Sequence, residues 1–184
     1  MPTNSFIEMN RKPFLHGYVQ VYTGDGKGKT TAALGLALRC AGAGYRVFIA
    51  QFIKCGEYSE QRSLRALSNI ACCQYGRGYW LQGKPSAEDI QMAQSGLREV
   101  REIIRAGNYK LVILDEACIA AWFKLLTTVD LLELIDKKPE GVELVFTGRK
   151  APQELLDRAD LVTEMREIKH YYSCGVLARE GIES

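Results

Sequence analysis

Residues 17–31 of this 184-residue chain read GYVQVYTGDGKGKTT, and the order of residue types in this stretch indicates the fold. The apolar, β-branched run at 17–23 predicts a strand, the glycines after it predict a tight loop, and the Ala- and Leu-rich residues after Lys29 predict a helix. This order is typical of a phosphate-binding loop, in which backbone N–H groups and the helix N-terminus surround an anion. The stretch therefore predicts nucleotide binding, with a flexible glycine-rich turn as the alternative.

The loop carries a full positive charge at Lys29 and offers a hydroxyl to Mg²⁺ at Thr30. Lys27 could reach a terminal phosphate or could simply be solvated. The standard pattern GxxxxGK[ST] would place its first glycine at Thr23, so a loop whose first glycine is Gly24 is one residue short. The candidate nucleotide ligands in the loop are Gly24, Asp25, Gly26, Lys27, Gly28, Lys29, Thr30 and Thr31.

A second apolar run, 111–116 (LVILDE), ends in two adjacent carboxylates. Parallel α/β sheets bind ligands at the carboxyl ends of their strands, so Asp115 and Glu116 are expected beside the loop. We predict a metal site of Thr30, Asp115 and Glu116 that takes Mg²⁺, with Mn²⁺ as an alternative ion. The competing interpretation is a strand-end carboxylate that caps the next helix.

The rest of the chain alternates β-branched runs with helical patterns, which predicts an α/β fold with a mostly parallel sheet of about six strands. The clearest helix is expected over 87–106, with a start signal at Ser86 and Asp89 and an end at Gly107. The strands are expected at 17–23, 45–51, 70–75, 110–115, 142–147 and 160–165.

Polar residues follow two further strands, at 51–54 (QFIK) and 147–150 (TGRK). Because the carboxyl ends of parallel strands share one edge, both groups are expected in the same crevice as the loop and the paired carboxylates. Arg149 could bind a phosphate through two parallel N–H groups, or it could be a solvated loop arginine.

The composition is that of an ordinary globular protein, with 24 Lys and Arg against 22 Asp and Glu, a net charge of +2 and 47% hydrophobic residues. We expect one domain over 17–184, preceded by a flexible segment at 1–16. The near-neutral net charge predicts no overall electrostatic attraction to nucleic acid or to an anionic membrane. No apolar run has the length of a signal peptide or a membrane span, which predicts a cytoplasmic protein, and the spacing of the six cysteines assigns none of them to a metal.

These residues indicate Mg²⁺-ATP chemistry without naming the reaction. His16 and His170 are the only histidines, and neither forms a Ser-His-Asp or Cys-His pattern. Glu116 could serve an ATPase by orienting a water molecule.

The combined motifs resemble those of the ATP:corrinoid adenosyltransferases. The blocks that carry the resemblance run in the family's order from Tyr18 to the C-terminus, and GKGKTTAA together with QFIK is far more specific than a phosphate loop alone. These blocks are TGDGKGKTTAALGLALR, QFIK, YGRGYW, LVILDE, FTGR, the pair Lys169-His170 and AREGIES. The resemblance implies a three-layer, RecA-like P-loop NTPase fold in which ATP binds in the reversed direction, in agreement with the short loop.

The same resemblance implies the reaction. Cobalt(I) of a reduced corrinoid attacks C5′ of ATP and expels triphosphate, so the protein supplies alignment and charge stabilisation through Lys29, Thr30 and Glu116. It also implies that Tyr79 lies over the corrinoid and helps to displace the lower axial ligand. Trp80 is a second candidate for corrinoid binding, with core packing as its alternative. A homodimer and a reducing flavoprotein as electron donor are implied as partners.

Two other functions stay open at this point. The first is a RecA-like ATPase that acts on a macromolecular partner and would release orthophosphate without a corrinoid. The second is a non-catalytic protein that carries a corrinoid or a nucleotide. In such a carrier the predicted Mg²⁺ ligands would have no function.

Overall fold

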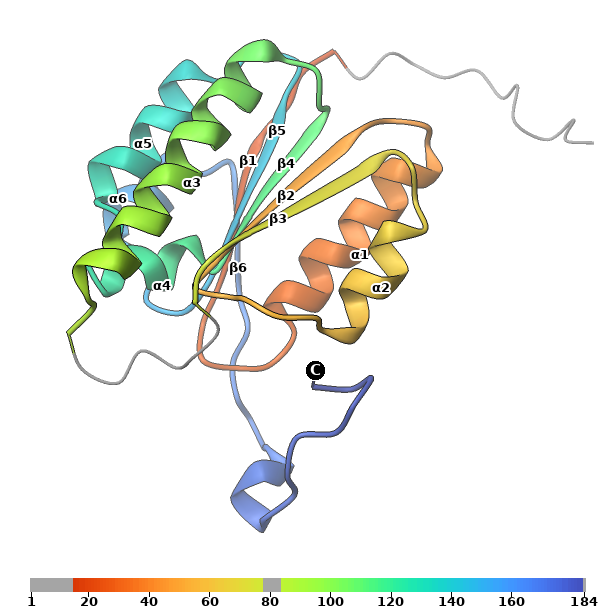
Figure 1. The fold of residues 1–184 in the computed structure, drawn as a ribbon, viewed down its shortest axis with the longest axis vertical. Helices are drawn as coiled ribbons and strands as arrows, with labels where there is room; N and C mark the ends of the chain where they lie inside the picture. Colours follow the sequence, from red (N-terminus) through yellow and green to blue (C-terminus); the bar gives the residue numbers. More distant parts are fainter. Residues whose placement is uncertain (1–14, 78–83, 184) are drawn as a thin grey trace, which may run out of the picture.

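The computed structural model describes residues 15–77 and 84–183, and in this part of the chain six strands form one sheet. The strand order is β3-β2-β4-β5-β1-β6 and every pair is parallel, which confirms the predicted α/β class (Figure 1). The observed bounds lie within two residues of the expected ones. The strands are β1 (Val19–Thr23), β2 (Val47–Phe52), β3 (Ile70–Tyr75), β4 (Leu111–Asp115), β5 (Glu143–Thr147) and β6 (Leu161–Glu164).

Helices cover both faces of the sheet and give three layers (Figure 1). Helices α1 (Lys29–Gly42) and α2 (Ser59–Arg65) lie on one face, and the remaining helices lie on the other. Those are α3 (Ala87–Ala106), α4 (Ala117–Trp122), α5 (Thr128–Lys137) and α6 (Gln153–Arg158), and a single 3₁₀ turn, η1 (Tyr171–Cys174), follows β6. None of the helices in the described ranges is both long and apolar enough to cross a membrane.

The two cores explain why the central strands are almost uniformly apolar. In β2, Phe48 packs toward α3 to α6, whereas Ile49 packs toward α1 and α2. Adjacent Cys72 and Cys73 of β3 likewise contribute to opposite cores. A strand buried on both faces must be apolar at every position, so alternation between apolar and polar residues is lost.

Helix α3 begins and ends where its sequence signals predict. The Ser86 hydroxyl accepts a hydrogen bond from the Asp89 amide at 3.2 Å, and the Asp89 carboxylate accepts one from the Ser86 amide at 2.9 Å. Gly107 ends the helix with a φ of 64°. Reciprocal capping of this kind is a local property, so the sequence alone predicts it.

Beyond β6 the chain leaves the sheet and returns to the phosphate loop. Met165 and Arg166 lie against the loop glycines, and the last described residues reach Lys27. Figure 1 shows this C-terminal segment below the sheet edge at which the strands end. The fold thus brings the loop after β1 and the far end of the chain together.

Candidate active site

Asp115, the last residue of β4, is the centre of the polar site. Its side chain is buried, and its Oδ1 accepts hydrogen bonds from the Thr30 hydroxyl at 2.9 Å and from the Thr147 hydroxyl at 2.7 Å. Thr30 belongs to the first turn of α1 and Thr147 ends β5. The carboxyl ends of β4 and β5 therefore meet the phosphate loop, as the sequence predicts.

The second oxygen of Asp115 is also fully engaged. Gln51 Nε2 donates to Oδ2 at 3.2 Å and Lys54 Nζ donates to it at 2.8 Å. Burial lowers the pKa of Lys54, but the charge and hydrogen bond of Asp115, together with the charges of Glu116 and Glu60, outweigh this effect and raise the pKa overall. Lys54 is thus held as a cation against a buried carboxylate, and the QFIK block, which spans the end of β2, supplies both Gln51 and Lys54 to Asp115.

Two glutamines orient Gln51 in turn. Gln61 of α2 donates its Nε2 to Gln51 Oε1 at 2.8 Å, and Gln74 of β3 donates to the same oxygen at 3.3 Å. With its oxygen occupied, the Gln51 amide directs its nitrogen toward Asp115. The sequence analysis missed Gln61 and Gln74; the signal available was a polar residue on the buried side of a short helix and one near the end of an edge strand.

Glu116 occupies an unusual backbone position at the start of α4. Its φ is 59°, in the left-handed region, and its amide donates to the Thr147 hydroxyl at 3.0 Å. Burial raises the pKa of the Glu116 carboxyl, and the Asp115 charge raises it further. A cation bound beside this carboxyl would oppose both effects and favour its ionised form.

The phosphate loop folds around the Lys29 side chain. Lys29 Nζ donates to the carbonyl oxygens of Gly24 and Gly26, each at 2.7 Å. Burial lowers the pKa of Lys29, and the charge of nearby Arg149 lowers it further. Arg149 follows β5 by two residues, at the edge of the sheet where Thr147 contacts Asp115.

The shape of the loop depends on the chain that follows β6. The Gly26 amide donates to the Met165 carbonyl at 2.7 Å, so this N–H group is already engaged. A Cβ atom on Gly24 would lie 2.4 Å from the Met165 carbonyl oxygen, and the φ of Gly24 is 93°. The sequence analysis assigned no role to Met165. Its contacts give a tertiary reason for the glycine at position 24.

The other predicted site residues lie in the phosphate loop, at the start of α1 or outside the described residues. Gly28 has a φ of 117° and caps α1, while Asp25 and Thr31 are exposed. Lys27 contacts the C-terminal segment. Tyr79 and Trp80 lie outside the described residues.

Comparison with known proteins assigns the family. Residues 15–184 match the model of the family described as ATP:corrinoid adenosyltransferase BtuR/CobO/CobP. The chain belongs to this family. This family transfers an adenosyl group from ATP to a corrinoid. The chain is therefore a member of a transferase family and not of a family of ATPases. The resemblance found in the sequence motifs is therefore confirmed.

Curated relatives agree with the family assignment. A corrinoid adenosyltransferase of Sinorhizobium sp is 34% identical over 171 residues, which cover 91% of this chain and 80% of the relative. A corrinoid adenosyltransferase of Escherichia coli (strain K12) is 29% identical over 167 residues, which cover 91% of this chain and 85% of the relative. The corrinoid adenosyltransferase of Pseudomonas aeruginosa is 30% identical over 169 residues, covering 91% and 83% of the two chains.

Proposed function

We propose that this adenosyltransferase family member transfers the 5′-deoxyadenosyl group of ATP to cobalt(I) of a reduced corrinoid and releases triphosphate. The observation that carries the proposal is the set of four hydrogen bonds that joins Asp115 to the short phosphate loop and to the ends of β2 and β5. These hydrogen bonds support the binding of a nucleoside triphosphate at this edge of the sheet. The family of this chain uses ATP and a corrinoid as substrates.

The chemistry demands little acid or base catalysis from the protein. The cobalt(I) of the substrate donates an electron pair to C5′, the bond between C5′ and the phosphate oxygen breaks, and that electron pair leaves with triphosphate. The protein must align the two substrates and stabilise the growing negative charge of the leaving group. Lys27, Lys29 and Arg149 are the cations of the site suited to that second task.

A bound Mg²⁺ would neutralise part of the triphosphate charge. The oxygen donors of Thr30, Asp115 and Glu116 suit Mg²⁺, or Mn²⁺ in its place. Both oxygens of Asp115 already accept hydrogen bonds, so we assign direct binding to Thr30 and Glu116. Asp115 then has the role of orienting the Thr30 hydroxyl.

The remaining parts of the proposal rest on the family resemblance. Tyr79 would lie over the corrinoid and weaken its lower axial ligand, and Trp80 would contribute to the same surface. A second copy of the chain and a reducing flavoprotein are the proposed partners, and the cytoplasm is the proposed compartment.

The decisive experiment is an anaerobic assay with ATP, Mg²⁺ and chemically reduced cobalamin or cobinamide. We expect the visible spectrum to change to that of the adenosylated corrinoid while triphosphate accumulates in equal amount. Release of ADP and orthophosphate without any dependence on the corrinoid would overturn the proposal and favour an ATPase.

A further inference from the structure

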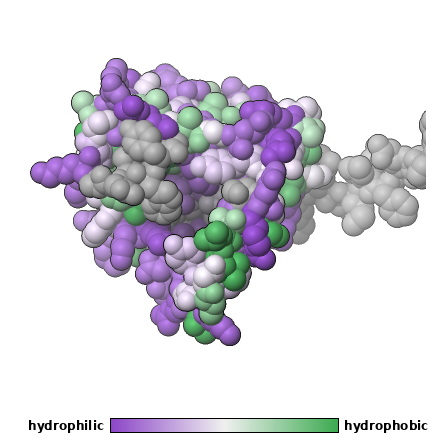
Figure 2. Space-filling view, turned by 60° about the horizontal axis from the view of Figure 1, so that its bottom comes forward, coloured by the Kyte–Doolittle hydropathy of each residue, from purple (hydrophilic) through white to green (hydrophobic). Residues whose placement is uncertain are grey.

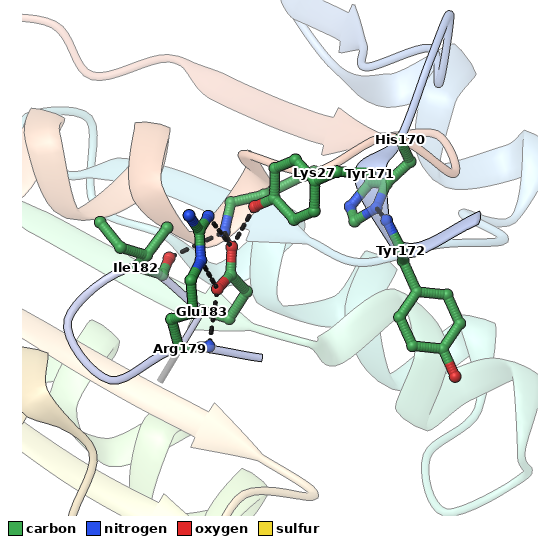
Figure 3. Close-up of polar contacts among 7 residues, drawn as sticks. All are labelled: Lys27, His170, Tyr171, Tyr172, Arg179, Ile182 and Glu183. Carbon is green, nitrogen blue, oxygen red and sulfur yellow. Dashed lines mark hydrogen bonds and ion pairs between the residues drawn. The ribbon is translucent and has the colours of Figure 1, made fainter. Parts of the chain in front are cut away.

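A polar cluster joins the phosphate loop to the C-terminal segment, residues 171–183. Lys27 Nζ donates to the Ile182 carbonyl at 2.7 Å and to Glu183 Oε1 at 3.0 Å (Figure 3). The two partners lie more than 150 residues further along the chain. Both acceptors of the Lys27 ammonium therefore come from the opposite end of the domain.

Glu183 is itself held in place by groups of the same segment. Its carboxylate accepts hydrogen bonds from the Tyr171 hydroxyl, from the Arg179 amide at 2.8 Å and from the Arg179 guanidinium at 3.3 Å (Figure 3). The Arg179 guanidinium lies 4.9 Å from the centre of the Tyr171 ring. The Arg179 and Tyr171 hydrogen bonds hold the pKa of the Glu183 carboxyl far below its usual range, so Glu183 is an anion at neutral pH.

This arrangement places two cations beside the loop with one anion between them. Lys27 and Arg179 would repel each other without Glu183, whereas the three groups together keep a net positive charge of one. Lys27 has a glycine on each side, at 26 and 28, so its long side chain gains no fixed direction from bulky neighbours. The two acceptors of the C-terminal segment supply that direction.

The attachment of this segment to the loop is polar, while its apolar side chains face solvent. Figure 2, in which the lower side of Figure 1 comes forward, shows apolar residues gathered over the segment. The exposed large hydrophobic residues of the segment are Tyr172, Val176, Leu177 and Ile182. Charged groups, rather than burial of apolar surface, hold the segment against Lys27.

We propose that Glu183 is a positioning residue for triphosphate binding, which holds the Lys27 ammonium at the phosphate loop. The inference rests on the proposed function, because it takes Lys27 as one of the phosphate ligands. A lysine fixed before the ligand arrives loses less side-chain freedom on binding than a mobile one. Glu183 therefore acts on the phosphates through Lys27 and without touching them.

Binding of inorganic tripolyphosphate with Mg²⁺, followed by calorimetry, tests the inference. We expect Glu183→Gln to raise the dissociation constant by about fivefold. Lys27→Gln, which removes the phosphate ligand itself, should raise the dissociation constant at least as much. The double variant should bind no more weakly than Lys27→Gln alone, because Glu183 acts only through Lys27. The matched control is Glu180→Gln, which removes the same charge three residues before Glu183. The Glu180 carboxylate pairs with exposed Arg62 of α2 at 3.0 Å instead of with Lys27. The Glu180→Gln variant should bind tripolyphosphate as the wild type does.

Kinetics separate positioning from a structural role. Glu183→Gln should raise the KM for ATP more than it lowers kcat, whereas a structural role would lower the melting temperature and kcat at an unchanged KM. Tighter tripolyphosphate binding by Glu183→Gln, an unchanged dissociation constant, or additive effects in the double variant would each overturn the inference. Failure of the proposed function is a different result, because the wild type would then form no adenosylated corrinoid whatever its affinity for tripolyphosphate.

Discussion

Two lysine–carboxylate pairs beside the phosphate loop have nearly the same geometry but different surroundings. Lys54 and Asp115 are 2.8 Å apart with side chains 20% and 2% exposed, whereas Lys27 and Glu183 are 3.0 Å apart with side chains 40% and 16% exposed. The inner pair lies at strand ends that the sheet fixes. The outer pair depends on a segment that leaves the sheet after β6. Their comparison separates what the sheet supplies to the site from what the end of the chain supplies.

The largest effect is expected at the inner pair. Asp115→Ala removes the acceptor of four donors and leaves the mostly buried Lys54 ammonium without its partner. We expect the free energy of unfolding to fall by about 3–5 kcal/mol, measured by urea denaturation. Asp136→Ala, which breaks the exposed ion pair between Asp136 and Arg158, is the matched control and should change it by less than about 1 kcal/mol. Equal effects of the two substitutions would show that burial does not distinguish the pairs.

Glu116→Gln should affect catalysis without loss of stability. The substitution keeps the shape of the side chain but removes the proposed metal ligand charge, so kcat/KM should fall roughly 10²-fold. Burial raises the pKa of Glu116, which means that the folded state disfavours the ionised form at neutral pH. The glutamine variant should therefore unfold at the same or a higher urea concentration than the wild type at pH 7. A clear loss of stability together with unchanged Mg²⁺ binding, measured by calorimetry, would argue for a structural role.

Gly24→Ala tests the contact that connects the loop to the chain after β6. The new Cβ atom would lie 2.4 Å from the Met165 carbonyl oxygen at a φ of 93°, so both the backbone and its neighbour must move. We expect a loss of about 2 kcal/mol in unfolding free energy and weaker tripolyphosphate binding. Gly35→Ala is the control, since a Cβ atom there has no heavy atom within 4 Å and the position is inside α1. Wild-type behaviour of Gly24→Ala would mean that Met165 does not shape the loop.

The smallest effect should come from salt. Between about 0.05 and 0.5 M NaCl, screening weakens exposed ion pairs much more than buried ones. Limited proteolysis should therefore cut the C-terminal segment faster at high salt, while the unfolding free energy of the sheet changes little. Glu183→Gln should already be cut quickly at low salt. A cleavage rate that does not depend on salt or on Glu183 would mean that charge does not hold the segment.

Several features of the site follow from local sequence alone. The loop before Lys29, the paired carboxylates at the end of β4 and the capping residues of α3 were all predicted, because each depends on neighbours within a few residues. The strands also lay within two residues of their expected bounds, since β-branched runs and turn residues mark them directly. The motif blocks, taken together in order, were sufficient to indicate the family.

Tertiary structure decided which groups meet. The sequence placed Thr30, Lys54 and Thr147 at strand or helix ends, but only the strand order brings them to the two oxygens of Asp115. Gln61 orients Gln51 because α2 packs beside β3, and no local sequence pattern predicts that packing. Lys27 and Glu183 are joined across almost the whole chain, and nothing in the spacing of their neighbours encodes that contact. Periodicity and turn signals are local, whereas the pairing of distant side chains depends on the order of the strands and the path of the chain after β6.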